Sequence, residues 1–312
     1  MKYVEFGAEK AKASEIIIGT MRIGELSTKE VAALIEAGLE VGINFIDTAD
    51  IYAGGKSEEI LGKVFAENPN LREKVILQSK CGIRIDEDFT WFDFSAEHIL
   101  NAVEGSLKRL QTDYLDCLLL HRPDALMEPE EIIEAFIKLQ DSGKVRNFGV
   151  SNFNPMMMAL LNEHIDFLDF PIVANQVQFS VAHTPMLDAN FQVNMHWDGA
   201  AMRDGGIFEY CRMNNIIIQS WSSLQYGYFE GVFLGSEKFP KLNAVLNRIA
   251  EEKDVTPAAV ALAWILKYPA KMQAVIGTTK PARVKESAKA ADIELTKKEW
   301  YEIYLAAGNK LP

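Results

Sequence analysis

The sequence predicts an α/β protein, a (β/α)8 TIM barrel that forms a single domain over residues 1–312 and carries long loops at its C-terminal face. Eight short, mostly apolar runs alternate with helical patterns along the chain. Apolar runs of this kind are typical of parallel strands that are covered on both faces. No Pro/Gly/Ser-rich linker interrupts the alternation, and the chain is long enough for a barrel of roughly 250 residues or more.

The predicted strands share short length and a high content of aliphatic residues. They are Ile16–Thr20, Asn44–Thr48, Val75–Lys80, Leu115–Leu120, Val145–Ser151, Ile172–Gln178, Ile216–Trp221 and Ala274–Thr278. A doubly wound sheet is the alternative, and in a dinucleotide-binding protein it requires a GxGxxG turn after the first strand. The segment from Gly19 to Gly24 lacks that motif, so the barrel is favoured.

Several predicted helices begin at residues that cap a helix or fit its first turn. Ser27 with Glu30 has the spacing of a capping box. Ser57 is predicted to cap the next helix, with Glu58 and Glu59 in its first turn, where the helix dipole favours acids. The other predicted starts are Ser95, Pro129, Pro155, Thr256-Pro257, Pro281 and Thr296 with Glu299.

The charge of the chain argues against some classes of partner. The formal net charge is -12, which disfavours a nucleic-acid backbone or an anionic membrane as the main partner. Three cysteines without a CxxC motif indicate a reducing compartment. We find no signal peptide and no apolar run that approaches the length of a membrane span, so a cytoplasmic protein is expected. Oligomeric state does not follow from the sequence.

Chemically complementary side chains follow three consecutive predicted strands. Asp47 and Tyr52 follow the second strand, Lys80 ends the third and His121 follows the fourth, and in a (β/α)8 barrel the chemistry occurs at these strand ends. A lysine cation lowers the pKa of a neighbouring phenol, whose ordinary value is near 10. Aspartate keeps that lysine charged and oriented, and a neutral histidine donates a hydrogen bond to a carbonyl. The set suits protonation of an alkoxide as it forms from a carbonyl.

Each of these residues also has a structural interpretation. In that interpretation, Asp47 only caps a turn and Tyr52 is a half-buried core residue. Lys80 is then a solvated residue after a strand, and His121 is a hydrogen-bonded core residue. Four complementary groups at consecutive strand ends favour a site over these separate explanations. The sequence contains no HExxH metal motif and no GxSxG nucleophile motif, so we predict no metal. A hydride must then come from an organic cofactor.

Four segments of the chain resemble the signature motifs of the aldo-keto reductase family. They are Asp47–Tyr52 (D-x-A-x-x-Y), Ser79–Gly82 around the lysine, Asp113–His121 (D-Y-L-D-x-L-L-x-H) and Gly143–Asn152 (G-K-V-R-x-x-G-V-S-N). The resemblance extends from about residue 16 to 290. The runs His121-Arg122-Pro123-Asp124 and Ser220-Trp221-Ser222 resemble a bacterial oxidoreductase subgroup of that family. Ala53 stands where family members commonly have glycine.

The resemblance implies NADPH-dependent reduction of an aldehyde or ketone. Tyr52 would be the general acid, Lys80 and Asp47 would tune it, and His121 would orient the carbonyl. Two other classes stay open: a cofactor-binding, redox-sensing accessory subunit with little turnover, and a barrel enzyme that acts on a phosphorylated sugar. The second expects a phosphate cradle after strands seven and eight and no Tyr–Lys–Asp set. The complete set favours turnover.

The resemblance also implies residues that hold NADP(H). Ser151, Asn152 and Gln176 would bind the nicotinamide carboxamide, and Trp221 would stack on the ring, although family members usually have tyrosine there and a core tryptophan is the alternative. The other implied cofactor residues are Gly19, Thr20, Ser222, Leu224, Gly277, Thr278, Lys280 and Arg283.

The segment from Gly277 to Arg283 bears on the choice between NADP and NAD. Lys280 and Arg283 at a predicted helix start suit a ribose 2′-phosphate, and the segment contains no acidic residue to hold a bare 2′-hydroxyl. An ordinary solvated helix start is the alternative. The pairing of charges favours NADP.

Three long loops are predicted to wall a substrate pocket. They are Phe89–Phe94, Val181–Arg203 with His196-Trp197, and Gln225–Phe239. Their aromatic side chains fit either an apolar carbonyl substrate or packing of the loops onto the barrel. A small carbonyl compound is the expected partner, and no substrate residue is assigned.

Overall fold

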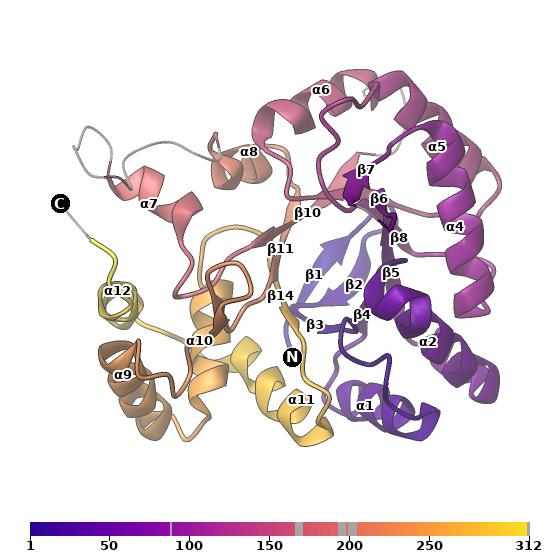
Figure 1. Cartoon of the computed structure of the whole chain (residues 1–312). Coiled ribbons are helices and arrows are strands. Elements are labelled where there is room, and N and C mark those ends of the chain that lie inside the picture. Colours follow the sequence, from indigo (N-terminus) through magenta and orange to yellow (C-terminus); the bar gives the residue numbers. More distant parts are fainter. Residues whose placement is uncertain (88, 166–170, 193–197, 199–204, 311–312) are drawn as a thin grey trace.

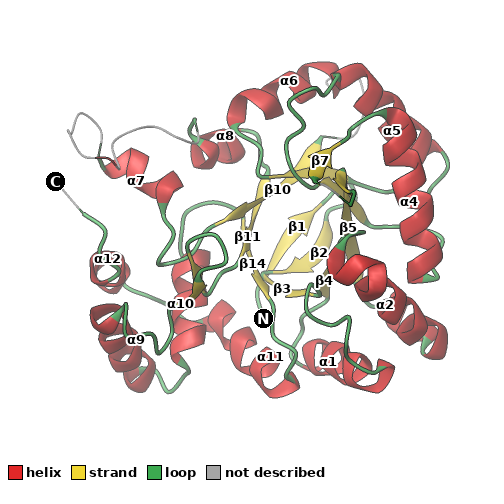
Figure 2. Cartoon of the chain, in the orientation of Figure 1, coloured by secondary structure: helices red, strands yellow, loops and turns green. Residues whose placement is uncertain are grey.

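A closed barrel of parallel strands, surrounded by helices, forms the body of the molecule (Figures 1 and 2). The computed structural model describes residues 1–87, 89–165, 171–192, 198 and 205–310, and eight parallel strands of this part of the chain close the barrel. The predicted (β/α)8 fold is therefore confirmed. No helix in the described residues is long and apolar enough to cross a membrane.

The barrel strands follow one another around the barrel in the order of the sequence. They are β3 (Ile16–Gly19), β4 (Phe45–Asp47), β5 (Ile76–Cys81), β8 (Cys117–Leu120), β9 (Phe148–Ser151), β10 (Ile172–Gln178), β11 (Ile217–Trp221) and β14 (Met272–Ile276). All eight predicted strands are present, most of them shorter than predicted. Leu115 and Val145, the predicted first residues of two strands, form only an isolated bridge with each other.

Helices cover the outside of the barrel and alternate with its strands. The main ones are α1 (Thr28–Glu40), α2 (Lys56–Glu67), α4 (Ala96–Leu110), α5 (Pro129–Asp141), α6 (Pro155–Ile165), α8 (Ile207–Met213), α10 (Pro257–Leu266) and α11 (Pro281–Ala288). Shorter or additional ones are η1 (Tyr52–Gly55), α3 (Pro69–Arg72), α7 (Pro185–Phe191), α9 (Pro240–Glu252), η3 (Lys289–Asp292) and α12 (Lys297–Ala306).

Most of the predicted helix starts are confirmed. Both capping boxes form: Ser27 with Glu30 opens α1, and Thr296 with Glu299 opens α12. Ser95 accepts a hydrogen bond from the backbone of the first turn of α4. The proline starts of α5, α6, α10 and α11 are also present. These caps satisfy backbone N–H groups that a helix start leaves without partners.

The predicted cap at Ser57 is wrong. Helix α2 begins at Lys56, and its cap is Gly55, two residues before the predicted cap; the φ of 89° at Gly55 gives a left-handed turn into the helix. Ser57 is fully buried and its hydroxyl has no hydrogen-bond partner among the described residues. The predicted acids Glu58 and Glu59 do lie in the first turn. Glu58 is fully buried there and accepts hydrogen bonds from Ser79 and Arg109.

An N-terminal hairpin closes the bottom of the barrel. Strands β1 (Tyr3–Phe6) and β2 (Ala11–Ser14) pair antiparallel, and in Figure 1 they lie across the barrel opening. Phe6 is buried inside the barrel and packs edge-on against Phe45 of β4, with ring centroids 5.0 Å apart. The hairpin excludes water from one end of the barrel, which leaves the opposite end as its only open mouth in the described residues.

Two small hairpins lie at the open mouth, where the carboxyl ends of the strands meet. Strands β6 (Ile83–Ile85) and β7 (Thr90–Phe92) form the first, and β12 (Gln225–Tyr226) with β13 (Gly231–Val232) forms the second. Each belongs to a loop that follows a barrel strand, so the two predicted long loops here contain short ordered strands.

Candidate functional site

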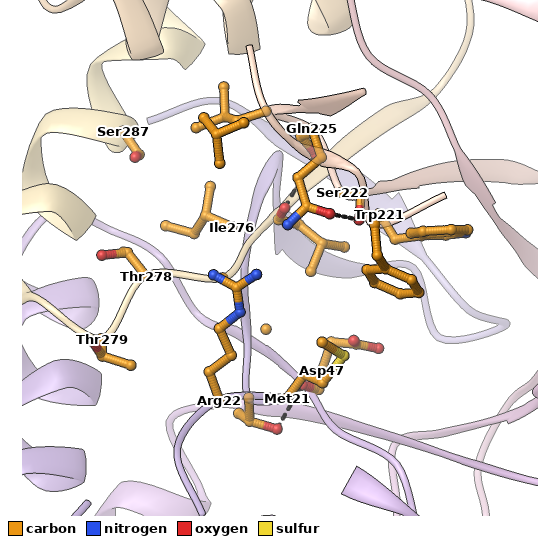
Figure 3. Close-up of a pocket in the computed structure, with 18 of the residues that line it drawn as sticks. Met21, Arg22, Asp47, Trp221, Ser222, Gln225, Ile276, Thr278, Thr279 and Ser287 are labelled. Carbon is orange, nitrogen blue, oxygen red and sulfur yellow. Dashed lines mark hydrogen bonds between the residues drawn. The ribbon is translucent and has the colours of Figure 1, made fainter. Parts of the chain in front are cut away.

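A cavity of about 990 Å³ opens at the carboxyl ends of the barrel strands. Every predicted site residue lines this cavity except Lys80, which lies beneath its floor with 0% exposure. Figure 3 shows Arg22 extending into the cavity, with Thr278 on one side and Trp221 on the other. The loops after β3, β4, β8, β9, β11 and β14 therefore supply one continuous surface, as the fold class predicts.

The Lys80 ammonium group joins three parts of the cavity floor. Its Nζ donates to the Asp47 carboxylate at 2.8 Å, to the Thr48 carbonyl oxygen at 2.7 Å and to the Tyr52 hydroxyl at 3.0 Å. All three donors of the ammonium group thus have acceptors. Because Lys80 and Asp47 are both buried, neither charge is left without a partner in a site where an unpaired charge is costly.

Burial and charge act in opposite directions on Tyr52. Burial raises the pKa of its phenol and outweighs the neighbouring Lys80 cation, which lowers the pKa. The predicted lowering by Lys80 is present, but the net direction is upward. Burial lowers the pKa of Lys80, but Asp47 and Tyr52 raise it more, so the net direction is again upward. Tyr52 is therefore a neutral phenol that holds a proton beside a lysine cation.

His121 lies across the cavity floor from Tyr52. Their rings meet edge to face with centroids 5.8 Å apart, and the His121 backbone N–H donates to the Cys81 carbonyl oxygen at 2.9 Å. Burial lowers the pKa of His121 well below its ordinary value, and the cations of Lys80 and Arg122 add to the shift. The imidazole is neutral at pH 7, and its Nδ1 has no partner among the described residues.

A network of buried glutamines supports Asp47 from inside the barrel. Gln78 and Gln176 donate to Asp47 Oδ1 at 2.7 and 3.0 Å. Both also donate to Gln219, which donates to Gln273 at 3.0 Å. A carboxylate held by several fixed donors keeps one orientation. The network thereby sets the position of the group that holds Lys80.

Ser151, Asn152 and Gln176 lie together, as the resemblance implies. Asn152 Nδ2 donates to the Ser151 hydroxyl at 2.9 Å and to the His121 carbonyl oxygen at 3.3 Å. The Asn152 backbone has a φ of 63°, a left-handed conformation that asparagine tolerates better than most residues. The Gln176 amide nitrogen donates to Asp47 and Gln219 below the floor of the cavity. Its Oε1 accepts no hydrogen bond from a described residue. This oxygen is available to an amide ligand.

Trp221 forms a wall of the cavity beside these polar groups. Its indole N–H donates to Asn152 Oδ1 at 3.1 Å, and its ring packs against Phe229, with centroids 5.8 Å apart. Ser222 follows in a left-handed conformation, with φ 50°, and donates to Gln225 Oε1 at 2.9 Å, a bond that Figure 3 also shows. Trp221 is part of the cavity lining rather than a core residue.

Gly19 and Thr20, at the end of β3, make close backbone contacts. A Cβ atom on Gly19 would lie 2.7 Å from Val275 Cγ1, so only glycine fits between β3 and β14 here. The Thr20 hydroxyl and backbone N–H both donate to the Asp47 carbonyl oxygen at 2.9 Å. The two residues therefore fix the backbone around Asp47 in addition to lining the cavity.

The far end of the cavity is formed by the segment before α11. The space beside Gly277 is open, and Thr278 accepts a hydrogen bond from the backbone N–H of Lys280, the residue that precedes the helix. Lys280 and Arg283 both line the cavity. A helix start with two cations and open backbone is a favourable environment for a phosphate group.

Three charged residues of the cavity were not selected from the sequence. Arg22 and Arg122 line it, and so does Glu286, which lies three residues beyond the segment that ends at Arg283. Arg22 lies two residues after Thr20, and Arg122 belongs to the quoted run His121-Arg122-Pro123-Asp124, so closeness in sequence to predicted site residues was the available signal. The glutamine network gave no such signal, because polar residues inside apolar strands reveal their contacts only once the strand register is known.

The loops that were predicted to wall a substrate pocket differ in whether they line the cavity. The loop after β11 lines the cavity with Tyr228, Phe229 and Val232, whereas the loop after β5 contributes Ile83. Phe94 is buried in the core and stacks on Phe153. His196-Trp197 lies outside the described residues. The aromatics after β11 thus line the cavity, whereas after β5 Phe94 packs into the core and Phe89 and Phe92 are exposed outside the cavity lining.

The match to a family model settles the family. The model of the aldo/keto reductase family matches residues 15–306.

The chain belongs to the aldo/keto reductase family.

Two curated relatives match this chain over nearly its whole length. A 6-dehydroglucose reductase of Agrobacterium fabrum is 34% identical, with 97% of each chain covered, and Oxidoreductase YdhF of Escherichia coli is 33% identical, with 94% of this chain and 93% of that protein covered.

A solved relative adds the cofactor. The crystal structure of an aldo-keto reductase from Klebsiella pneumoniae in complex with NADPH superposes with a TM-score of 0.76 at 28% identity, over 97% of this chain and 93% of that one. This aldo/keto reductase is accordingly an NADP-dependent oxidoreductase. Its cavity residues fit that cofactor, because open backbone at Gly277, the start of α11 and several cations lie at one end and a free amide acceptor lies at the other.

Proposed function

We propose that this aldo/keto reductase reduces an aldehyde or ketone to the alcohol, with Tyr52 as the proton donor. The observation that carries the proposal is the Lys80 ammonium group, which bonds to Asp47, Thr48 and the Tyr52 hydroxyl at once. A buried phenol beside a fixed cation keeps its proton in the resting state and is stabilised as phenolate once the proton has left. Both properties suit an acid that acts on a developing alkoxide.

The carbonyl oxygen of the substrate fits between Tyr52 and His121, whose rings meet edge to face across the floor. Bound NADPH supplies a hydride to the carbonyl carbon. The neutral His121 imidazole donates one hydrogen bond to the carbonyl oxygen and adds no charge. Tyr52 then transfers its hydroxyl proton to that oxygen. Lys80 stabilises the resulting phenolate, and Asp47 keeps Lys80 charged and in place.

The cofactor contacts follow from the groups at each end of the cavity. Gln176 Oε1, Ser151 and Asn152 are assigned to the nicotinamide carboxamide, and Trp221 to the nicotinamide ring. Ser222 and Leu224 are assigned to the pyrophosphate region between the two ends, together with Gly19 and Thr20. Lys280 and Arg283 are assigned to the ribose 2′-phosphate, beside Gly277 and Thr278.

The redox-sensing accessory subunit is not favoured by the comparisons, because relatives above 30% identity that have a named activity are reductases. One of those relatives is named for reduction of methylglyoxal, and two are named for reduction of 6-dehydroglucose, a sugar-derived carbonyl compound. We include hydroxylated aldehydes of this kind among the substrates to be tested.

The test is turnover with purified protein. Oxidation of NADPH is followed by absorbance in the presence of aliphatic, aromatic and hydroxylated aldehydes, for the wild type and for Tyr52→Phe. The variant is expected to lose about 10²–10⁴-fold in kcat, the usual contribution of a general acid. Equal turnover by both proteins would remove Tyr52 from the mechanism. Tight NADPH binding without turnover of any aldehyde by the wild type would restore the sensing alternative.

A further inference from the structure

Arg122 places a positive charge in the wall of the cavity beside the proposed reaction centre. It follows His121 directly in the chain and lines the same cavity as Tyr52 and Trp221. Its charge reaches both proposed catalytic groups, since it lowers the pKa of Tyr52 and of His121. A ligand that occupies the floor of the cavity therefore comes within reach of the guanidinium group.

Aromatic rings hold Arg122 in place. Its guanidinium carbon lies 5.5 Å from the centroid of the Trp221 ring and 5.8 Å from that of Tyr228. Contacts of this kind stabilise a cation by about 0.5–1 kcal/mol at partly exposed sites. No hydrogen bond joins the guanidinium N–H groups of Arg122 to a described residue, so these donors are available to a ligand.

No carboxylate in the described part of the chain forms an ion pair with Arg122. Among the cations at the cavity, Lys80 pairs with Asp47 beneath the floor, whereas Arg22, Lys280 and Arg283 are exposed and form no ion pair within the described residues. Arg122 differs from these three because it is half-buried and lies beside the rings of Trp221 and Tyr228. Arg84 is the informative comparison, because it also stacks on a tryptophan, Trp91, but pairs with Asp93 at 3.0 Å. Arg122 has the stacking and lacks the anion.

We propose that Arg122 is a specificity-determining residue that selects carbonyl substrates carrying a carboxylate, that is, aldehydo or keto acids. The inference rests on the proposed function, because it places the substrate carbonyl at Tyr52 and His121. A carboxylate matches the planar fork of guanidinium donors with two parallel hydrogen bonds. A chain with a net charge of -12 repels small anions in general, so a fixed unpaired cation at the reaction centre is what allows an anionic substrate to be accepted.

The test compares substrates that differ only in charge. The aromatic pair is 4-carboxybenzaldehyde and 4-formylbenzamide, and the aliphatic pair is 4-oxobutanoate and 4-oxobutanamide. Values of kcat/KM are measured for the wild type, Arg122→Met and Arg122→Lys. Arg122→Met is expected to lower kcat/KM for the carboxylates by about tenfold to a hundredfold, the range of a charge-assisted hydrogen bond, and to change the amides by less than about threefold. Lysine keeps the charge without the fork, so an intermediate loss is expected.

Arg84→Met is the matched control, since it removes a stacked arginine that does not line the cavity. It is expected to leave the ratio of carboxylate to amide unchanged. The dissociation constant of NADPH is measured for each variant by quenching of tryptophan fluorescence.

Equal losses for carboxylate and amide in Arg122→Met, with or without weaker NADPH binding, would overturn the inference, because Arg122 would then act through Trp221 or the cofactor. A wild type without preference for the carboxylates would overturn it as well. Both results leave the proposed carbonyl reduction standing, whereas absence of turnover with all four aldehydes in the wild type would contradict the reduction itself.

Discussion

At the scale of single residues, the loop between Asp47 and Tyr52 contains a second buried acid. The Asp50 backbone N–H donates to the Lys80 carbonyl oxygen at 3.1 Å, but its carboxyl Oδ1 has no hydrogen-bond partner among the described residues. Burial raises the pKa of Asp50 from 3.8 to about 7, and the nearby Glu58 carboxylate adds to the shift while Arg109 opposes it. Asp50 therefore resists ionisation inside the loop that carries Tyr52.

This resistance predicts a pH dependence of stability. Because the folded-state pKa of Asp50 is above its unfolded value, stability from this residue is fully present below about pH 4 and is lost as pH rises through about 7. Asp50→Asn removes the ionisation. The variant is expected to gain stability relative to the wild type between pH 5 and pH 8, on the order of 2 kcal/mol, measured by urea unfolding at both values.

The control for Asp50 is Asp141→Asn, at the exposed end of α5. It is expected to leave the difference between the two pH values unchanged. If Asp50→Asn behaves like this control, the Asp50 carboxyl is not held in its protonated form by burial.

At the scale of elements, the turn η1 carries Ala53 in a conformation that suits glycine. Ala53 has a φ of 52° inside η1, and the left-handed conformation costs a residue with a Cβ roughly 1–2 kcal/mol. This is the position where the sequence departs from the family pattern. The turn must place Tyr52 against Lys80, so the strained residue lies directly beside the proposed proton donor.

Ala53→Gly is expected to stabilise the protein by about 0.5–1 kcal/mol, since relief of strain exceeds the added flexibility of the unfolded chain. Ala66→Gly is the matched control, because Ala66 is exposed in α2 and glycine there destabilises a helix by up to about 1 kcal/mol. Denaturant unfolding gives both values. A destabilised Ala53→Gly would show that the turn does not strain alanine.

The start of α11 tests the cofactor end of the site. Arg283→Ala is expected to weaken NADPH binding by about tenfold or more and NADH binding by less than about twofold, because only NADPH carries the 2′-phosphate. Lys285→Ala is the control on the same helix, since Lys285 pairs with Glu40 and does not line the cavity. Equal weakening of both cofactors in Arg283→Ala would contradict the assigned contact.

Elements with a strong periodic or capping signal were predictable, and elements defined by partners in space were not. The eight barrel strands and both capping boxes follow from local sequence. The hairpin β1–β2 did not, because its short strands are half polar and acquire a buried side only where Phe6 enters the barrel. The prediction of a cap at Ser57 was wrong because the helix begins two residues earlier, with Gly55 as its cap.

At the scale of the whole molecule, the barrel interior is layered. Apolar side chains around Phe6 and Phe45 fill the closed end, buried glutamines lie above them, and the charged pair of Asp47 and Lys80 lies beneath the open cavity. The sequence indicated the charged layer of Asp47 and Lys80, because both residues stand at the ends of predicted strands. It did not indicate the glutamine layer, because barrel register decides which strand positions face inward.

We propose that the chain unfolds as the single domain that the sequence predicts, since the barrel strands contribute to both apolar clusters, one shared with the helices and one shared with the hairpin. Calorimetry is expected to show one transition. NADPH at about 100 times its dissociation constant should add about 2.7 kcal/mol to the free energy of unfolding. Two separate transitions, of which NADPH shifts only one, would contradict a single domain.

The central claim is that Tyr52 and Lys80 act as one proton-donating unit, and a double-mutant cycle tests it most directly. The rate of NADPH oxidation in a single turnover is measured for the wild type, Tyr52→Phe, Lys80→Met and the double variant, with NADPH affinity as the check on folding. Each single change is expected to slow the reaction by about 10²–10⁴-fold, and the double variant should be no slower than the slower single one. Losses that multiply in the double variant would contradict the unit.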